Sequence, residues 1–507
     1  MGSRRIFNTL RQTHLENRLF FIFLSLWILI FLGIRTVQHF SFGTNACDLS
    51  LFDYGMHSTL KGQLMSDPFH KFGFGRWDVS NGELTFVPGY AKSWESHFCI
   101  HFTPIIFFIV PFYLIFEGPL FLLYLQVLAV GLSALPLYFI AKAVFKAKYA
   151  ALSIAVIYLF FRQLLIGLMH DTHMEMYFPL FLFSSVYFVA IKKRRVPYFL
   201  FITLALLIKE DIAIYIFFLG IFLILKFREK KYGFITSVYA FLYFILAFGV
   251  IIPYFRKQAG MDSLYVYAHV WGYAGNNILQ VMANMLSHPG EILKHISLGS
   301  FLKAFSNIVS PLLLLPFFSS FFFLALPPLF LALLSKNPQF YTFGIHYSAT
   351  LLPFIFLAFL EGLKNIKKFF YQLRGGRFRK VFSLILILLL AINLANSSFW
   401  RVIKPSRYKA LGDYWSVKKI IDQVPPQASV AALSAIIPHI PKRKNIFMLP
   451  ETDEADYIIV HAGINLWPYT KEQFSNFLAR IEKEKRYICV YQEGEIKFFK
   501  KKQRDSS

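Results

Sequence analysis

Acidic side chains are scarce in this chain, whose 507 residues include 28 aspartates and glutamates against 53 lysines and arginines. Charged residues of both signs make up 16% of it, whereas 56% are hydrophobic and 61 residues are phenylalanine. Soluble domains carry charge on about a quarter of their residues, so this composition disfavours a soluble protein. Any local concentration of carboxylates therefore stands out.

Nucleic-acid binding is the function class that a net charge of +25 first suggests, and the distribution of the charge excludes it. Most basic residues fall in short loops between apolar runs and at the two termini. Such residues orient a membrane protein, because positive loops stay on the cytoplasmic side. The charge indicates a topology and not a nucleic-acid partner.

Cysteine is also rare, with three in the chain. Cys489 lies in the C-terminal region, while Cys47 and Cys99 stand at the two ends of a polar loop. If this loop is extracytoplasmic, the two can form a disulfide. The alternative is a pair of free thiols.

Apolar runs recur along residues 19–395, and many approach the ~20 residues that cross a bilayer. These runs must be helices, since backbone polar groups in lipid have to be satisfied internally. Applying the positive-inside rule loop by loop gives about eleven transmembrane helices. We predict a polytopic α-helical protein of the cytoplasmic (inner) cell membrane, with a cytoplasmic N-terminus and residues 1–395 as its membrane domain.

A polar loop, residues 42–102, follows the first apolar run and is predicted to lie outside the membrane. It holds a large share of the scarce carboxylates: Asp48, Asp53, Asp67, Asp78, Glu83 and Glu95. We expect this loop to roof an active site. The next run, residues 105–116, is either a full span or a helix at the outer interface. Lys142, Lys146 and Lys148, which end the run after it, favour the interfacial helix.

Hydropathy falls after residue 395, and residues 396–507 are predicted to form a small extracytoplasmic α/β domain. Residues 414–424 and 471–485 are predicted as helices, and residues 429–436, 445–449, 456–461, 486–491 and 495–500 as strands. The segment has no glycine-rich nucleotide loop and no metal-ligand spacing. We expect it to shape or cover the site and assign it no chemistry.

Asp48 and Asp53, directly after the first run, are the candidate catalytic residues. A carboxylate at the outer membrane surface can take a proton from an acceptor hydroxyl or amine, or hold a divalent cation. In a helix, Asp53 and His57 share a face, whereas Asp48 lies on another. The alternative is that both aspartates are solvated loop residues.

Lys209, Glu210 and Asp211 interrupt an apolar stretch and are candidates for substrate binding. The flanking arms, residues 197–208 and 212–225, are short for a bilayer ~30 Å thick. The turn is therefore predicted to lie at membrane depth in a protein-lined cavity. Three charges there are costly unless they are paired or serve a ligand, and lysine suits a phosphate. The alternative is an ordinary exposed turn.

Asp171 and His173, in the outer loop His170-Asp171-Thr172-His173, can transfer protons or bind zinc, although the spacing is generic. Arg162, within an apolar run, either serves function or snorkels to the surface. His101 and His346 each open an apolar run and are either substrate-binding or interfacial packing residues.

Five short motifs follow one another along the chain: Asp48-Leu49-Ser50-Leu51-Phe52-Asp53, His101-Phe102-Thr103-Pro104, Asp171-Thr172-His173, Lys209-Glu210-Asp211 and His346-Tyr347. In this order they resemble an uncharacterised bacterial and archaeal family of polytopic membrane proteins, known only as a domain of unknown function. That family is similar to the GT-C glycosyltransferases. The resemblance covers most of the chain.

The resemblance implies sugar transfer from a polyprenyl-phosphate donor on the outer face of the membrane. GT-C enzymes have an acidic residue just after the first span, which Asp48 matches, and a lysine at a helix break, which Lys209 resembles. Arg162 followed by Asp171 also resembles their pattern, as does His101, although Phe-Thr stands where a proline is usual. Asp48 is followed by leucine and not by a second acidic residue, so a divalent metal is possible but not implied.

Two other functions remain open. A transporter or lipid flippase would have inverted repeats and midplane charges, whereas no repeat is visible and the charges cluster toward the outer face. A non-catalytic protein of envelope assembly would tolerate alanine at Asp48, Asp171 and Lys209. The leading hypothesis is an inverting glycosyltransferase with a lipid-phosphate donor and an unspecified sugar and acceptor.

Overall fold

The computed structural model describes residues 2–69, 76–80, 83–87, 95–145, 147, 149–261, 268–374, 378–484 and 486–502. Parts of the sequence predictions rest on Lys146, Lys148 and residues 70–75, 81–82 and 88–94 of the polar loop, which lie outside the described residues. The helices before residue 396 are α1 (Gly2–Phe40), α2 (Leu51–Leu60), α3 (Ile106–Tyr113), α4 (Pro119–Val144), α5 (Ala150–Leu159), α6 (Arg162–Met169), α7 (Phe178–Val186), α8 (Arg195–Leu206), α9 (Ile212–Phe227), α10 (Lys230–Leu246), α11 (Ile252–Ala259), α12 (Ala268–Trp271), α13 (Ile278–Ser287), α14 (Pro289–Leu293), α15 (Leu298–Ile308), α16 (Phe322–Leu333), α17 (Pro338–Tyr341), α18 (Leu352–Arg374) and α19 (Phe378–Ala395).

Among the described residues, five helical segments are long and apolar enough to cross a membrane: His14–Phe40, Pro119–Val144, Met174–Ile191, Lys230–Ala259 and Lys380–Asp422. A sixth results if α5 and α6, which meet at a bend of 45°, count as one span. The helical membrane architecture agrees with the sequence prediction, but the count of eleven crossings is not confirmed. Helices α8 and α9 have 12 and 16 residues, so α8 extends only about 18 Å.

Helix α3, with eight residues, is far too short to cross a bilayer. It follows the polar loop, which contains α2 and two small antiparallel strand pairs, β1 (Ser66–Asp67) with β4 (Glu95–Ser96) and β2 (Arg76–Ser80) with β3 (Glu83–Val87). The interfacial alternative for residues 105–116 is thus the one consistent with the structure. Cys47 and Cys99 are free thiols, as is Cys489.

A five-stranded sheet occupies the C-terminal part of the chain, in the order β6-β5-β7-β9-β8. Its strands are β5 (Val430–Ala432), β6 (Ile446–Met448), β7 (Tyr457–His461), β8 (Tyr487–Glu493) and β9 (Ile496–Lys501), and its helices α20 (Phe399–Val402), α21 (Tyr414–Asp422) and α22 (Lys471–Lys483). The first three strands pair in parallel and the last two antiparallel. These elements overlap the ranges predicted from the sequence.

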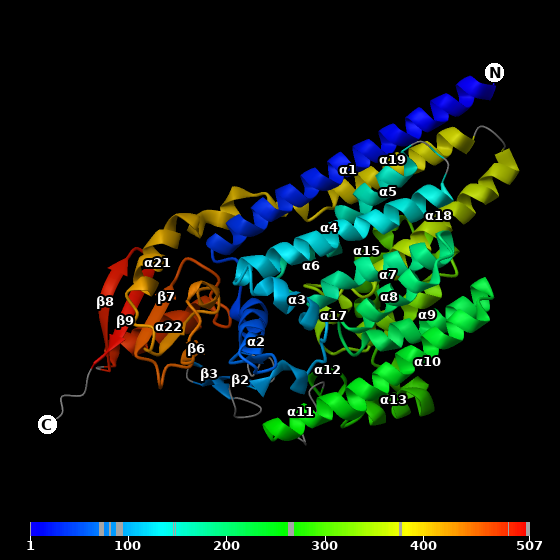
Figure 1. Cartoon of the computed structure of the whole chain (residues 1–507). Helices are drawn as coiled ribbons and strands as arrows, with labels where there is room; N and C mark the ends of the chain where they lie inside the picture. Colours follow the sequence, from blue (N-terminus) through cyan, green and yellow to red (C-terminus); the bar gives the residue numbers. More distant parts are fainter. Residues whose placement is uncertain are drawn as a thin grey trace.

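The polar loop and the sheet share one apolar core. Phe42, Tyr54 and Phe69 of the loop are fully or almost fully buried in the same cluster as Val430 and Ile459 of the sheet. Ala46 also donates a backbone hydrogen bond to the Ser434 carbonyl. The two segments are far apart in sequence but pack as one body at one end of the helices (Figure 1).

Basic residues gather at the other end. Lys142 of α4 donates a hydrogen bond to Asn17 of α1, and the ammonium of Lys367 in α18 lies 4.7 Å from the ring centroid of Phe382 in α19. Figure 1 shows the N-terminus at the opposite end of α1 from the C-terminal sheet. By the positive-inside rule the end with Lys142 and Lys367 is the predicted cytoplasmic end.

Candidate active site

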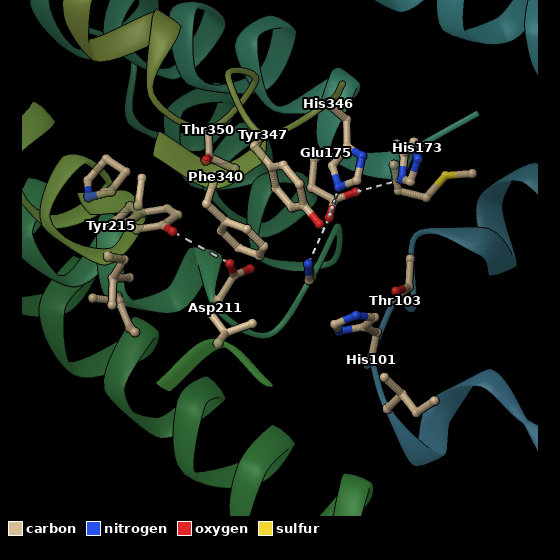
Figure 2. A pocket seen from close by; sticks show the side chains of 18 of the residues that line it. His101, Thr103, His173, Glu175, Asp211, Tyr215, Phe340, His346, Tyr347 and Thr350 are labelled. Carbon is tan, nitrogen blue, oxygen red and sulfur yellow. Dashed lines mark hydrogen bonds and ion pairs between the residues drawn. The ribbon is translucent and has the colours of Figure 1, made fainter. Parts of the chain in front are cut away.

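A cavity of about 340 Å³ lies where the polar loop meets the ends of the helices. Its polar side chains come from five separate stretches of chain and face one another across the cavity (Figure 2). They are Asp48, His97, His101, Thr103, His173, Glu175, Lys209, Asp211, Tyr215, His346, Tyr347 and Thr350. The arrangement concentrates several of the chain's scarce carboxylates in one place.

The other half of the cavity is apolar. Val270 and Trp271 of α12, Val281 and the two methionines of α13, and residues of α16 and α17 line it: Met282, Met285, Pro328, Leu331, Ala332 and Phe340. An apolar wall beside a charged cluster fits an amphipathic guest, with a charged group on one side and hydrocarbon on the other.

The loop that carries His170 and His173 is fixed through its backbone. Arg35 of α1 is fully buried and donates hydrogen bonds to the carbonyls of Met169 (3.0 Å) and His170 (2.8 Å). Gln126 of α4 donates to the Asp171 carbonyl at 2.9 Å and accepts from the His173 amide at 2.7 Å. Two polar residues within apolar helices thus hold the loop rigid.

Asp48 faces this loop from the helical turn Ala46–Ser50, which directly precedes α2. Its Oδ2 lies 3.5 Å from His173 Nε2 and 3.7 Å from His170 Nδ1. Burial alone would raise the pKa of Asp48, but the neighbouring His173 and His170 outweigh it and hold that pKa below its usual value. Asp48 is therefore ionised at neutral pH, as a proton acceptor or a cation ligand must be.

Asp171 lies behind Asp48, 2% exposed, and accepts a hydrogen bond from the Asn45 amide at 2.9 Å. Burial and the adjacent charge of Asp48 raise the pKa of Asp171 to about 7. Two carboxylates with such different proton affinities can divide the roles of acid and base.

Glu175 connects the lysine and histidines of the site. Its carboxylate accepts a hydrogen bond from Lys209 Nζ at 2.8 Å, and lies 3.8 Å from His346 Nε2 and 4.0 Å from His173 Nδ1. The two imidazoles stack, with ring centroids 3.4 Å apart. Figure 2 shows Glu175 next to both rings.

Glu210 joins the end of the polar loop to the turn before α9. It is fully buried, and its carboxylate accepts hydrogen bonds from the Phe102 amide (2.9 Å) and faces His101 Nδ1 at 2.8 Å. The Tyr215 hydroxyl is 3.5 Å from Asp211 Oδ2. Glu210 thus positions His101 and does not itself line the cavity.

Most of the residues chosen from the sequence meet here. Six line the cavity: Asp48, His101, His173, Lys209, Asp211 and His346. Asp171 and Glu210 stand directly behind them. Asp53 and Arg162 do not line the cavity.

Asp53 belongs to a different cluster, 3.0 Å from Lys442 and 2.5 Å from the Tyr113 hydroxyl. Arg162 is exposed and begins α6, whereas His170 follows the end of that helix.

Sequence reasoning missed Glu175, Arg35 and Gln126. One sequence feature could have marked all three as functional candidates. Each is a polar side chain within an apolar run or at its start. Their partners could not be foreseen, because Arg35 and His170 are 135 positions apart in sequence.

Two groups of side chains could hold a metal ion among the described residues: His170, His173 and His346, and Asp48, His170 and Asp171. Within each group one ligand atom per residue lies within 4.8 Å of the others. Imidazole and carboxylate together suit a first-row transition metal better than magnesium.

Solved structures similar to this chain include ArnT from Cupriavidus metallidurans in the apo state, with a TM-score of 0.42 and 10% identity over 94% of this chain and 98% of that chain. ArnT from Cupriavidus metallidurans bound to undecaprenyl phosphate gives a TM-score of 0.40 and 12% identity over 93% and 97%. Scores at this level carry no conclusion about function. None of the curated proteins matches the chain.

One protein family matches nearly the whole chain. The match extends over residues 38–497 and carries the description predicted membrane protein (DUF2079). It includes the polar loop, the cavity and most of the C-terminal sheet, and it confirms the resemblance to an uncharacterised membrane family drawn from the motifs. The chain is therefore a member of the DUF2079 family of predicted membrane proteins.

Proposed function

We propose that this protein is a membrane glycosyltransferase that moves a sugar from a polyprenyl-phosphate donor to an acceptor on the outer face of the cytoplasmic membrane. One observation carries the proposal: a single cavity combines an aspartate, a lysine and an apolar wall. A sugar carried on a lipid phosphate has three matching parts. They are the anomeric carbon that the activated acceptor attacks, the phosphate and the hydrocarbon chain.

Asp48 is the residue we assign to activation of the acceptor. Its carboxylate lines the cavity and is ionised. In an inverting transfer the acceptor oxygen forms a bond to the anomeric carbon and gives its proton to the base. The bond from that carbon to the phosphate oxygen breaks at the same time, and the polyprenyl phosphate leaves with the electron pair. A positioned base contributes about 10²–10⁴-fold to such a step.

Lys209 is the residue we assign to the donor phosphate. A lysine has three N–H donors, and Glu175 accepts one at 2.8 Å. Moving Lys209 Nζ partly from Glu175 to an incoming phosphate would keep the ammonium paired throughout. Positive charge at the leaving phosphate stabilises the charge that develops in the transition state. His101 and Asp211 lie on the same wall and are assigned to the sugar or acceptor.

The apolar wall supports a lipid and not a free sugar nucleotide. Trp271 and the methionines of α13 offer hydrocarbon contact, and methionine adapts to irregular chains. Undecaprenyl phosphate, named for one of the similar structures, is a probe of this chemical class.

The test is turnover by purified wild-type protein in liposomes with a panel of polyprenyl-phosphate sugars. We expect release of polyprenyl phosphate that depends on an added acceptor. Lys209→Met should weaken undecaprenyl phosphate binding about tenfold or more, because one charge-assisted hydrogen bond is worth about 1.5–3 kcal/mol. Lys418→Met, at a half-buried lysine of α21 that pairs with Asp422 and does not line the cavity, is the matched control. Movement of intact donor across the membrane without release would support a flippase and contradict the proposal.

A further inference from the structure

We propose that Asp211 recognises the sugar of the donor by accepting hydrogen bonds from its hydroxyl groups. The inference rests on the proposed function, because it takes the donor phosphate to bind at Lys209. It goes further by naming the residue that selects the sugar. It also restricts the sugar to one that presents hydroxyl groups, and no acidic group, at the edge facing Asp211.

The first argument is the direction of the Asp211 side chain. Asp211 directly precedes α9, at the position where an aspartate usually caps a helix by accepting a hydrogen bond from an amide of the first turn. Its side chain makes no such bond, and the Ile214 amide donates instead to the main-chain carbonyl of Asp211 at 3.0 Å. The carboxylate lines the cavity (Figure 2). Helix capping therefore does not account for this aspartate.

The second argument is the lack of partners for the carboxylate. Among the protein groups that the structure describes, Asp211 Oδ1 is buried and has no hydrogen-bond partner. Asp211 Oδ2 is 3.5 Å from the Tyr215 hydroxyl, which is long for an O–H···O hydrogen bond. The neighbouring Lys209 donates a hydrogen bond to Glu175 at 2.8 Å. Since a carboxylate has about four acceptor sites, Asp211 can accept hydrogen bonds from a guest.

The third argument is the surroundings of the carboxylate. The rings of Phe340 and Tyr347 stack with centroids 3.9 Å apart and an interplanar angle of 23°, and both line the cavity together with Thr350. Figure 2 shows the Phe340 ring pointing toward Asp211. A sugar has an apolar C–H face that packs on aromatic rings and an edge of hydroxyl groups that forms hydrogen bonds. A carboxylate, a hydroxyl and aromatic rings together suit such a guest.

The other parts of the donor fit Asp211 less well. A carboxylate repels a phosphate of the same charge, and an unpaired charge against hydrocarbon is costly. Asp211 lies two positions after Lys209 in the same turn, so a phosphate at Lys209 brings the sugar bonded to it within reach of Asp211. An acidic sugar in this place would meet a like charge, which disfavours it.

A binding assay without acceptor separates the donor sugar from the acceptor. Full-length protein in detergent is titrated with undecaprenyl-phosphate conjugates of glucose, galactose, mannose and N-acetylglucosamine. The reference probe is the methyl diester of undecaprenyl phosphate, which has the same charge but no sugar. We expect at least one conjugate to bind wild-type protein about tenfold or more tightly than the methyl diester, the gain expected of one hydrogen bond to a charged group.

Replacing Asp211 by alanine should remove this gain without weakening the binding of the methyl diester. Asp211→Asn, which keeps one carbonyl acceptor, should lose less of the gain. The absence of a gain for all four conjugates in the wild type would overturn the inference. A gain that survives in folded Asp211→Ala would also overturn it.

Removing single hydroxyl groups from the preferred conjugate tests direct contact. For the hydroxyl that Asp211 binds, the deoxy change and Asp211→Ala should be non-additive. The deoxy analogue should bind about tenfold more weakly than its parent in the wild type and almost equally in Asp211→Ala. Additive losses at every hydroxyl position would contradict the contact.

Asp422→Ala is the matched control, because Asp422 is an exposed aspartate of α21 that pairs with Lys418 and does not line the cavity. It should bind every probe like the wild type, and elution from a sizing column shows that each variant is folded. Lys209→Met should weaken the methyl diester and the conjugates alike, which tests the phosphate site separately. A sugar-dependent gain that Asp211→Ala removes, without transfer to any acceptor, would support this inference and contradict only the transfer reaction.

Discussion

At the residue scale, Arg35 shows how a charged side chain inside an apolar helix can serve the backbone of a site. It is fully buried and donates to three successive carbonyls, those of Met169, His170 and Asp171. Guanidinium is suited to this because its donors form a rigid fork. The positions of His170 and His173 therefore depend on a residue that does not touch the cavity.

Replacing Arg35 by methionine should lower the free energy of unfolding by at least about 2 kcal/mol, because each buried carbonyl left unpaired costs about 1–3 kcal/mol. Thermal unfolding in detergent measures this loss of stability. Arg162→Met removes an exposed arginine and should change stability by about 0.5 kcal/mol at most. Equal effects of the two substitutions would contradict the role given to Arg35.

Asp53 provides a pH prediction at the same scale. Burial raises the pKa of Asp53 although Lys442 opposes this, so the folded state holds its proton more tightly than the unfolded chain, whose Asp pKa is about 3.9. The contribution of Asp53 to the free energy of unfolding is then fully present below about pH 3.9. It is lost as the pH rises through the pKa that Asp53 has in the folded protein. Relative to Asp53→Asn, the wild type should melt at increasingly higher temperature as pH falls from 7 toward about 4, the unfolded pKa of an aspartate. A constant difference would contradict this.

Position along the chain and the motif resemblance selected Asp48, His173, Lys209 and His346, all of which line the cavity, because a polar residue between apolar runs needs a reason to be there. The same logic selected Arg162 and Asp53, which the structure places elsewhere. Sequence alone cannot separate a residue that faces a cavity from one paired across the fold. For Asp53 that partner, Lys442, lies in the C-terminal part of the chain.

At the element scale, the polar loop is attached to the helices by Glu210 in the turn between α8 and α9. The Glu210 carboxylate binds the Phe102 amide and His101, and the Ile105 amide donates to the Leu207 carbonyl. The break between two short helices, which sequence length predicted, thus supplies the anchor for the loop.

Glu210→Leu should release this anchor, whereas Glu210→Gln keeps a carbonyl for the Phe102 amide and an amide donor for His101. Hydrogen exchange of the peptide covering residues 97–105 measures the difference. We expect exchange at least about tenfold faster in Glu210→Leu, since about 1.4 kcal/mol of local stability corresponds to a factor of ten, and near wild-type exchange in Glu210→Gln. Slow exchange in both variants would contradict the anchoring role.

The helix count shows where sequence reasoning stops at this scale. Hydropathy finds apolar runs, but it does not show where a run bends, as between α5 and α6. For residues 105–116, the lysines that end the following apolar run favoured an interfacial helix, and α3, with eight residues, is indeed too short to cross a bilayer. Runs bounded by strong charge are therefore easier to interpret than runs broken internally.

At the scale of the whole molecule, the predicted sidedness makes Cys489 a natural probe. It is exposed, whereas Cys99 is buried and Cys47 is partly covered. Cys489 lies in β8, at the end of the molecule away from the N-terminus (Figure 1). If the basic end is cytoplasmic, this thiol faces outward.

A membrane-impermeant maleimide should label wild-type protein in intact cells and fail to label Cys489→Ala. A cysteine placed at Lys193, in the basic loop before α8, in the Cys489→Ala background should react only after the cells are opened. Labelling of Lys193→Cys in intact cells would reverse the orientation and place the cavity on the cytoplasmic side.

The central claim is that the cavity is a catalytic site built around Asp48, and two matched substitutions test it most directly. Asp48→Asn and Asp53→Asn make the same chemical change in neighbouring turns, but only Asp48 lines the cavity. Release of polyprenyl phosphate from its sugar conjugate should fall about 10²–10⁴-fold in Asp48→Asn and change at most a few-fold in Asp53→Asn. Full activity in Asp48→Asn, or equal loss in both variants, would contradict the account.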